Sequence, residues 1–228
     1  MKSKNVAFVP VRGGSKGIID KNIKIINGFP LVYYVLKSLE DSELVDDIYV
    51  ATDSNKIAKV VENFNFNKVS VYKRDDVNAT DSSSTESVML EFLEKNYCNQ
   101  DDNFILVQAT SPFTTSEDFD NGIKLIQKED DSVLSCVKVK RFFWNFDGNP
   151  INYDFKNRPR RQDFTGCFME NGAFYINKVR NILKYKNRIS GNIKIYEMPE
   201  YTSFEIDEEY DLIIVEDLLK RYWNVLDK

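Results

Sequence analysis

An abrupt break in an apolar run near the N-terminus constrains the fold of this chain more than any other feature. Residues 6–11 have the apolar, β-rich composition of a strand that is buried on both faces. The six residues that follow include three glycines, two of them adjacent. We therefore expect a buried strand that ends in a glycine-rich loop, with the rest of the chain supporting that loop.

This loop combines backbone freedom with positive charge. Glycine accepts positive φ, so consecutive backbone N–H groups can point at one anion. Arg12, Lys16 and Lys21 add three positive charges nearby. The spacing fits neither the dinucleotide-binding G-x-G-x-x-G nor the P-loop G-x-x-x-x-G-K-[ST]. We expect a polyphosphate-binding loop of another kind; the alternative is an ordinary βα turn whose lysines are solvated.

Apolar β-rich runs alternate with helix-periodic segments along most of the chain, which predicts an α/β fold built from βαβ units. A length of 228 residues and 42% hydrophobic residues suffice for a full core, so we expect a single domain over 1–228. Strands are expected at 6–11, 47–52, 69–72, 104–107, 132–137, 171–176 and 193–198. Helices are expected at 31–41, from a cap at Asp53 or Ser54 to about 64, from about 82 to 93, from Ser116 or Asp118 to 126, and through 212–222.

Composition excludes several function classes. The chain has no histidine, so a Ser-His-Asp triad or a His-liganded zinc site is excluded. The net charge of −5 gives no overall attraction to nucleic acid. The three cysteines are widely spaced, as in proteins with reduced thiols. The sequence shows no signal peptide and no membrane-span pattern, so we expect a cytoplasmic protein without nucleic-acid or membrane partners.

Polar side chains follow two of the predicted strands. Arg74 comes shortly after the strand at 69–72, and Gln108 follows the strand at 104–107. The carboxyl ends of parallel strands share one sheet edge, where open α/β folds bind ligands. We therefore expect these residues beside the glycine loop.

A hydroxyl-rich run at 80–85 has two interpretations. Ser82 or Ser83 with Glu86 approximates a capping box for the helix that follows. The run either caps this helix only, or caps it and also contacts a nucleobase.

Two acids near the C-terminus form a candidate metal site. If 203–207 is extended, its period of two places Glu205 and Asp207 on one face while Phe204 and Ile206 point to the core. Paired carboxylates suit Mg²⁺. The alternative is that these acids stabilise the N-terminus of the next helix, which accounts poorly for Glu205.

The strand and helix alternation stops at residues 139–165. Aromatic residues flank an Asp-Gly-Asn-Pro segment at 147–150, which predicts a hairpin turn. The exposed aromatics of such an arm favour packing on a partner. Arg158, Arg160 and Arg161 resemble a nucleic-acid surface, but the acidic whole argues against that interpretation.

Four blocks in this order resemble the CMP-sialic acid synthetases, also called acylneuraminate cytidylyltransferases. Residues 9–22 are similar to the signature P-A-R-G-G-S-K-G-x-x-x-K-N, and 106–112 to the L-Q-P-T-S-P block. Residues 171–176 resemble N-G-A-x-Y-I, and 205–207 with Asp211 resemble D-I-D…D-L. The similarity spans about residues 5 to 220.

The resemblance implies a three-layer α/β fold like that of nucleotide-diphospho-sugar transferases, with a mostly parallel twisted sheet and a protruding β-hairpin dimerisation arm at about 139–165. It implies a homodimeric nucleotidyltransferase that joins CTP to a nonulosonic acid such as N-acetylneuraminate or Kdn, releasing CMP-sugar and pyrophosphate. The implied cofactor is Mg²⁺, with Mn²⁺ as an alternative.

Site residues follow from the same resemblance. Arg12, Lys21 and Asp207 are the implied catalytic residues, with Asp207 the main metal ligand and Glu205 the second. Arg74 and 81–85 would recognise cytidine, Gln108 the acceptor sugar, and Arg160 the sugar or the partner's site. The implied substrate-binding residues are Gly13, Gly14, Ser15, Lys16, Asn22, Arg74, Ser82, Ser84, Thr85, Gln108, Thr110, Ser111, Arg160, Asn171 and Tyr175.

The chain departs from the family pattern at three places. Glu205 stands where the family usually has an aspartate, and Ala109 where it usually has a proline. Phe113-Thr114 lacks the arginine that in the family often follows the proline of the second block. The acceptor contacts and its identity stay open among N-acetylneuraminate, Kdn and bacterial relatives such as legionaminate.

In the implied reaction, the anomeric hydroxyl attacks the α-phosphate of CTP in line. Lys21, Arg12 and backbone N–H groups would stabilise the developing charge. Without histidine, the proton is expected to go to a hydroxide or to a carboxylate such as Asp207 or Asp211. Alternatives are a transferase for Kdo or another nucleotide-sugar pyrophosphorylase on the same fold, and a non-catalytic nucleotide-sugar-binding regulator.

Overall fold

A seven-stranded, mostly parallel sheet forms the centre of the computed structural model, which describes residues 3–14, 17–80, 83–95 and 97–226. The strand order is β5-β4-β1-β6-β8-β7-β9, and β8 alone runs antiparallel to its neighbours. These strands are β1 (Asn5–Pro10), β4 (Asp47–Thr52), β5 (Val69–Lys73), β6 (Asn103–Val107), β7 (Asp131–Val139), β8 (Cys167–Lys178) and β9 (Asn192–Met198). A small second sheet pairs β2 (Ile25–Ile26) with β3 (Phe29–Pro30).

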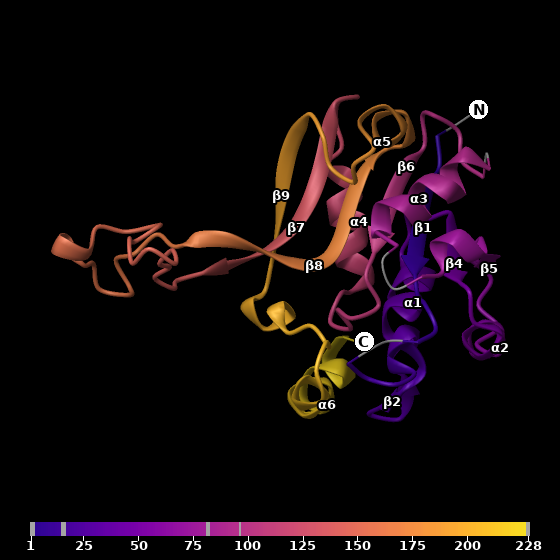
Figure 1. Ribbon diagram of the computed structural model, residues 1–228, viewed down its shortest axis with the longest axis horizontal. Helices are drawn as coiled ribbons and strands as arrows, with labels where there is room; N and C mark the ends of the chain where they lie inside the picture. The colour runs from indigo at the N-terminus through magenta and orange to yellow at the C-terminus, as the bar shows by residue number, and fades with distance from the viewer. Residues whose placement is uncertain (1–2, 15–16, 81–82, 96, 227–228) are drawn as a thin grey trace.

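Helices cover both faces of the sheet, giving the three layers expected from the sequence (Figure 1). One face packs against α1 (Leu31–Asp41), α2 (Asn55–Glu62) and α4 (Ser116–Lys124). The other packs against α3 (Thr85–Glu94) and α5 (Val179–Tyr185). The 3-10 helices are η1 (Lys21–Ile23), η2 (Asp76–Asn78), η3 (Phe155–Asn157) and η4 (Glu200–Ser203).

The first strand is buried on both faces, as its composition predicts. Ala7 and Val9 belong to the core under α1, α2 and α4, whereas Phe8 packs under α3. All three side chains have no exposed surface. The strand therefore anchors the glycine loop to the most rigid part of the molecule.

A third core brings the C-terminal segment next to that loop. The last helix, α6 (Glu209–Leu226), buries Val215, Leu219 and Trp223 against residues of the N-terminal part, including Ile18. Ile206 is completely buried in the same cluster. Tyr222, on the same helix, is 39% exposed and stacks on Tyr201.

The helix caps differ from the predictions in detail. Ser54 caps α2 by accepting from the Ile57 N–H, one of the two expected choices. Pro30 lies at the N-cap of α1, directly before the expected start of this helix at residue 31. The cap of α4 is Thr115, which forms a capping box with Asp118. Helix α5, which the sequence analysis missed, has only seven residues.

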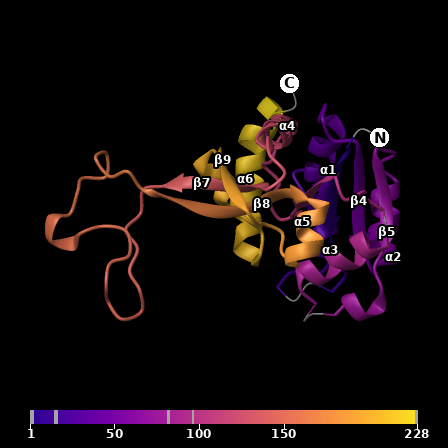
Figure 2. The ribbon, with the colours of Figure 1, turned by 90° about the horizontal axis from the view of Figure 1, so that it is seen from above.

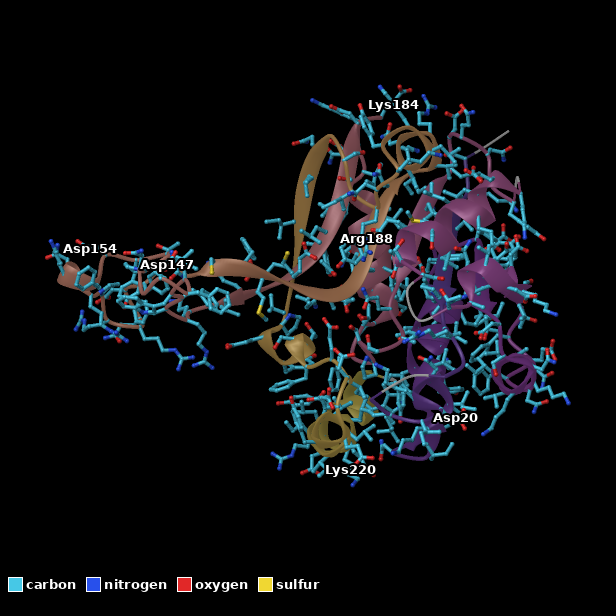
Figure 3. The ribbon with its side chains drawn as sticks, in the orientation of Figure 1. Asp20, Asp147, Asp154, Lys184, Arg188 and Lys220 are labelled. Carbon is cyan, nitrogen blue, oxygen red and sulfur yellow. The ribbon has the colours of Figure 1, made fainter. Side chains whose placement is uncertain are left out.

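The arm predicted for about 139–165 projects from the body as an extension of β7 and β8 (Figure 1, Figure 2). The expected hairpin turn is confirmed, since the Asn145 N–H bonds the Asn149 carbonyl and Trp144 bridges Pro150. Asp147 and Asp154 lie at its outer part (Figure 3). The Arg158 guanidinium lies 4.3 Å from the centre of the Phe142 ring.

Side chains on the arm leave large apolar surfaces open in the single chain. Phe146 is fully exposed, and Ile151 and Phe155 are more than half exposed.

Among the described residues, no helix has the length and apolar character needed to cross a membrane.

Candidate active site

The carboxyl ends of β1, β5 and β6 open onto a cavity of about 480 Å³. Residues from the glycine loop, from the start of α3 and from the segment before α6 complete its wall. The lining residues are Pro10, Arg12, Gly17, Lys21, Asn22, Arg74, Ser83, Ser84, Thr85, Val88, Gln108, Ala109, Thr110, Asp207 and Glu208. This is the sheet edge at which open α/β folds bind ligands.

Lys21 joins the glycine loop to the acidic segment across this cavity. Its Nζ donates to the Ile206 carbonyl at 2.7 Å and lies 3.0 Å from the Asp207 Oδ1 atom. The Lys21 side chain is 14% exposed and that of Asp207 is 70% exposed. The cation is therefore fixed, whereas its carboxylate partner remains open to solvent and to a ligand.

Gly17 is required by the close approach of the same two segments. A Cβ atom on Gly17 would lie 2.6 Å from the Asp207 carbonyl oxygen. Because this neighbour is backbone, it cannot rotate away, so any side chain here would push the loop and the acidic segment apart.

The first turn of the glycine loop is held from outside the cavity. The Gly13 N–H donates to Asp53 Oδ1 at 2.9 Å, so this group already has a protein acceptor. Gly14 has a φ of +70°, the left-handed conformation that glycine adopts without strain. Gly13 and Gly14 are not among the lining residues, and Ser15 and Lys16 lie outside the described residues.

Asn22 stabilises the loop from within. It is 7% exposed, and its amide donates to the Arg12 carbonyl at 3.2 Å. This bond positions the Arg12 backbone at the cavity, where the Arg12 side chain is part of the wall.

Arg74 is the most buried cation of the cavity wall. It is 7% exposed, its Nε donates to the Ala51 carbonyl at 2.9 Å, and its backbone N–H donates to the Thr52 carbonyl. Burial lowers the pKa of the Arg74 guanidinium, an effect that the charge of Asp53 opposes. The group remains a cation because an arginine pKa starts far above neutrality.

The hydroxyl-rich run contributes Ser83, Ser84 and Thr85 to the wall, and Ser82 lies outside the described residues. Ser84 is the N-cap of α3, accepting from the Ser87 N–H at 3.0 Å. The capping box expected from Ser82 or Ser83 with Glu86 is therefore wrong in register. Glu86 instead pairs with Arg188 at 2.6 Å, and Figure 3 labels this arginine near the middle of the molecule.

The segment after β6 divides between the cavity and the core. Gln108 and Thr110 line the cavity, whereas Ser111 is 2% exposed and its hydroxyl donates to the Asn171 carbonyl. Asn171 is 1% exposed and its amide donates to Thr202 at 3.0 Å. Ser111 and Asn171 thus have structural contacts and lie outside the lining set.

Two further predicted residues lie away from the cavity lining. Tyr175 is 5% exposed and its hydroxyl donates to Glu170 at 3.0 Å. Burial raises the pKa of the Tyr175 phenol to about 12, so this group stays protonated at neutral pH. Arg160 lies on the arm and pairs with Asp163 at 2.6 Å.

The acidic segment is only partly as predicted. Ile206 points into the core, but Phe204 is 41% exposed, so the expected burial of both apolar side chains is wrong for Phe204. The reason is that η4 ends at Ser203, which leaves too short an extended run for strict alternation. The Ile206 N–H donates to the Thr110 carbonyl and fixes this segment beside Gln108.

Glu205 has an unusually high pKa for a glutamate. Burial raises its pKa to about 7, and the negative charge of Asp207 adds to this effect. A Cβ atom on Gly172 would lie 2.5 Å from the Glu205 Oε1 atom, so the carboxyl group packs closely against β8 at Gly172. A cation placed between Glu205 and Asp207 would favour ionisation of both.

The donor chemistry at this place fits magnesium. The described residues contain no cluster of three or more acidic or thiol side chains able to hold a metal alone. Mg²⁺ in phosphate-transferring sites commonly takes only one or two carboxylates and fills its other positions with water and substrate phosphate. Of the two acids that the sequence predicts as metal ligands, Asp207 lines the cavity and Glu205 does not.

Sequence reasoning missed two residues that shape the site. Asp53 was considered only as a helix cap, yet it holds the Gly13 N–H. Glu208 lines the cavity but was not among the predicted site residues, whereas Ser83 belongs to the run 81–85 for which cytidine recognition was predicted. The Thr-Asp-Ser triplet after a predicted strand was the available signal for Asp53, because an acid at a sheet edge beside a cationic loop is a natural partner.

A family model described as "Cytidylyltransferase" matches residues 6–224, nearly the whole chain. The chain belongs to this cytidylyltransferase family. It is 35% identical over 231 residues to N-acylneuraminate cytidylyltransferase A of Danio rerio, covering 97% of this chain and 52% of that protein. It is 36% identical over 225 residues to N-acylneuraminate cytidylyltransferase of Oncorhynchus mykiss, covering 95% and 50%. The chain thus spans about half the length of these relatives.

The fold of this cytidylyltransferase family member is also that of a solved synthetase. CMP:2-keto-3-deoxy-manno-octonic acid synthetase, solved in complex with CTP, superimposes with a TM-score of 0.73. The alignment covers 96% of this chain and 99% of the synthetase at 17% identity. The expected nucleotide-diphospho-sugar transferase-like fold is confirmed.

The raised pKa of Glu205 predicts how stability depends on pH in the metal-free protein. Below pH 4.5 the carboxyl group is protonated in both folded and unfolded chains, so Glu205→Gln and wild type should be equally stable. As the pH rises to about 7, the unfolded chain loses the proton first, and wild-type stability falls relative to the variant. Above pH 8 the variant should be more stable by about 1–3 kcal/mol.

Urea unfolding from pH 4 to 8.5 measures this difference. Glu208→Gln removes an exposed acid of the same segment and serves as the matched control. A stability difference between Glu205→Gln and wild type that does not change with pH would contradict the burial of this carboxyl group.

Proposed function

We propose that this chain is an N-acylneuraminate cytidylyltransferase unit, which joins CTP to a nonulosonic acid and releases the CMP-sugar and pyrophosphate. The contact of Lys21 with Asp207 carries this proposal, because it brings a phosphate-binding cation and a metal-binding acid to one cavity. The similarity to the two fish enzymes supports the same reaction.

In this proposal the triphosphate lies along the glycine loop, with Arg12 and Lys21 as its principal cations and Lys16 as a third. The Asn22 amide supports the loop through the Arg12 carbonyl, and Asp53 holds the Gly13 N–H. Arg74 and the first turn of α3 hold the cytidine at the other end of the cavity, where Arg74, Ser84 and Thr85 line the wall. Gln108 and Thr110, which follow β6 and also line the cavity, would contact the acceptor sugar.

The reaction forms one P–O bond and breaks another. The anomeric hydroxyl of the acid attacks the α-phosphorus of CTP, and the bond to the β,γ-pyrophosphate opens on the opposite side. Negative charge grows on the non-bridging and leaving oxygens, where the ammonium of Lys21 and the guanidinium of Arg12 stabilise it.

The attacking hydroxyl loses its proton to an acceptor beside the α-phosphate. Asp207 suits this role better than Asp211, because Asp211 Oδ2 already accepts the backbone N–H groups of Asp207 and Glu208 at 2.9 and 2.8 Å. Asp207 has a solvent-exposed carboxylate at the cavity wall.

Asp207 and Glu205 are the residues that would hold magnesium. Bound Mg²⁺ supplies positive charge to the phosphate oxygens and polarises them. Lys21 keeps Asp207 oriented toward the cavity before the metal and nucleotide bind.

The functional assembly in this proposal is a cytoplasmic homodimer. The exposed aromatic and aliphatic side chains of the arm support a second copy as the partner. Arg160, which is on the arm in the single chain, would contact the acceptor in the partner's cavity. The three free cysteines agree with a reducing compartment.

Pyrophosphate release tests the proposed reaction directly. With CTP, Mg²⁺ and a panel of N-acetylneuraminate, Kdn, legionaminate and Kdo, we expect release with at least one nine-carbon acid and none in EDTA. UTP and GTP are the matched controls. Pyrophosphate release with Kdo alone would show that the chain is a cytidylyltransferase for the eight-carbon acid. CTP binding without pyrophosphate release with any acid would favour a non-catalytic regulator.

Lys21→Ala tests the cation that carries the proposal. Loss of one preorganised charge at the transition state should lower kcat about a hundredfold or more. Lys24→Ala removes an exposed lysine three residues away and should leave kcat near wild type. Near-normal turnover of Lys21→Ala would exclude Lys21 from the mechanism.

The dimer is tested with Phe146→Ser combined with Ile151→Ser. Both side chains are exposed in the single chain, so the change should not lower its thermal stability, but it should shift sedimentation from dimer to monomer. Ile213→Ser, at an exposed position of α6, is the control and should remain dimeric. An unchanged dimer in the double variant would exclude the arm as the interface.

A further inference from the structure

We propose that Glu91, which does not line the active-site cavity, is a positioning residue that holds Arg74 and Ser83 in place and so sets the affinity for the nucleotide. This inference rests on the proposed function, which names CTP as that nucleotide. It concerns α3, residues 72–80 and Ser83; Arg74 and Ser83 line the cavity.

Glu91 is a buried carboxylate surrounded by donors. Its side chain is 7% exposed. Oε1 accepts from the Tyr72 hydroxyl, from the Asp75 N–H at 3.0 Å and from Lys95 Nζ at 3.4 Å. Oε2 accepts from the Asn78 amide at 2.6 Å. Four donors converge on one acid, and three of them come from the stretch that runs from β5 through η2.

Two of these contacts fix Arg74 from both sides along the chain. Tyr72 is two residues before Arg74, and Asp75 is the next residue after it. The guanidinium can reach the cavity only if the backbone leaves β5 in this direction, because its Nε is tied to the Ala51 carbonyl. Glu91 therefore fixes the direction in which the backbone leaves β5, and this direction places Arg74 at the cavity.

The third contact fixes Ser83 through η2. The Asn78 amide that donates to Glu91 belongs to η2, and the neighbouring Val77 carbonyl accepts from the Ser83 hydroxyl at 3.3 Å. Asn78 also reaches the Ser87 carbonyl in the first part of α3, at 3.5 Å. A shift of η2 would therefore move Ser83 at the cavity wall.

Replacing Glu91 with glutamine preserves shape but not the hydrogen-bond pattern. If the amide oxygen stays on Tyr72 and Asp75, the new NH₂ group meets the NH₂ group of Asn78, and two donors face each other. Asn78→Asp in the same chain restores an acceptor opposite that NH₂ group. The double variant thus reverses the hydrogen bond and also restores the net charge.

Steady-state kinetics and calorimetric titration of CTP test the inference. Glu91→Gln should raise both the KM and the Kd for CTP about tenfold, with kcat and the KM for the acid within about twofold. Glu91→Gln with Asn78→Asp should bring the KM for CTP back to within about threefold of wild type. The control, Glu94→Gln, removes an exposed acid of the same helix that pairs with Lys186, and should not change the KM.

Asn78→Ala removes only the amide that donates to Glu91 Oε2. This variant is used for the same measurement if Glu91→Gln does not fold. It should raise the KM for CTP several-fold. An unchanged KM for CTP in the folded variants, or a fall in kcat at constant KM, would overturn the positioning role. Failure of wild type to release pyrophosphate from CTP would instead overturn the proposed function, and the two failures are distinct because CTP binding is measured separately.

Discussion

The active-site arrangement depends on one partly buried ammonium group, that of Lys21. Lys21 and Ile206 are 185 positions apart in the chain, and the Lys21 Nζ bonds both the Ile206 carbonyl and the next side chain, Asp207. Apolar packing stabilises this contact, because Ile18 and Ile206 belong to one hydrophobic cluster with residues of α6. The close packing of Gly17 on the Asp207 backbone leaves no room for these segments to slide.

Charge around the cavity is balanced in a way that suits a polyanion with a metal. Arg12 and Arg74 are close enough that the charge of Arg12 contributes to lowering the pKa of Arg74. Asp53 moderates this repulsion and also holds the loop through the Gly13 N–H. In the acidic segment, burial raises the pKa of Glu205, and repulsion from the negative charge of Asp207 adds to this effect. A nucleotide triphosphate with a divalent cation would relieve both repulsions.

Much of this arrangement follows from the sequence because strong local patterns agree with the tertiary structure. The buried strand β1, the glycine loop and the hairpin turn at 147–150 depend on composition and turn chemistry, which are local. The residues that the sequence could not place depend on long-range contacts. Ser111 follows β6 just as Gln108 does, but its hydroxyl is taken by the Asn171 carbonyl.

Other errors have the same origin. Glu86 matches a capping box in sequence, but Arg188, 102 residues away, pairs with it and Ser84 caps the helix. Phe204 alternates with Ile206 in sequence, but η4 ends directly before it. Glu91 has only one local partner, Lys95 four residues later, and its other three donors are brought to it by the packing of α3 against β5 and the segment that follows β5.

A double-mutant cycle tests most directly whether Lys21 and Asp207 act as one unit. Lys21→Ala, Asp207→Ala and the double variant would be compared by kcat/KM for pyrophosphate release from CTP. The account predicts that the double variant loses little more activity than the more damaged single variant, since each change removes the same joint contact with the triphosphate. Losses that multiply fully in the double variant would show that the two residues act independently and would contradict the account.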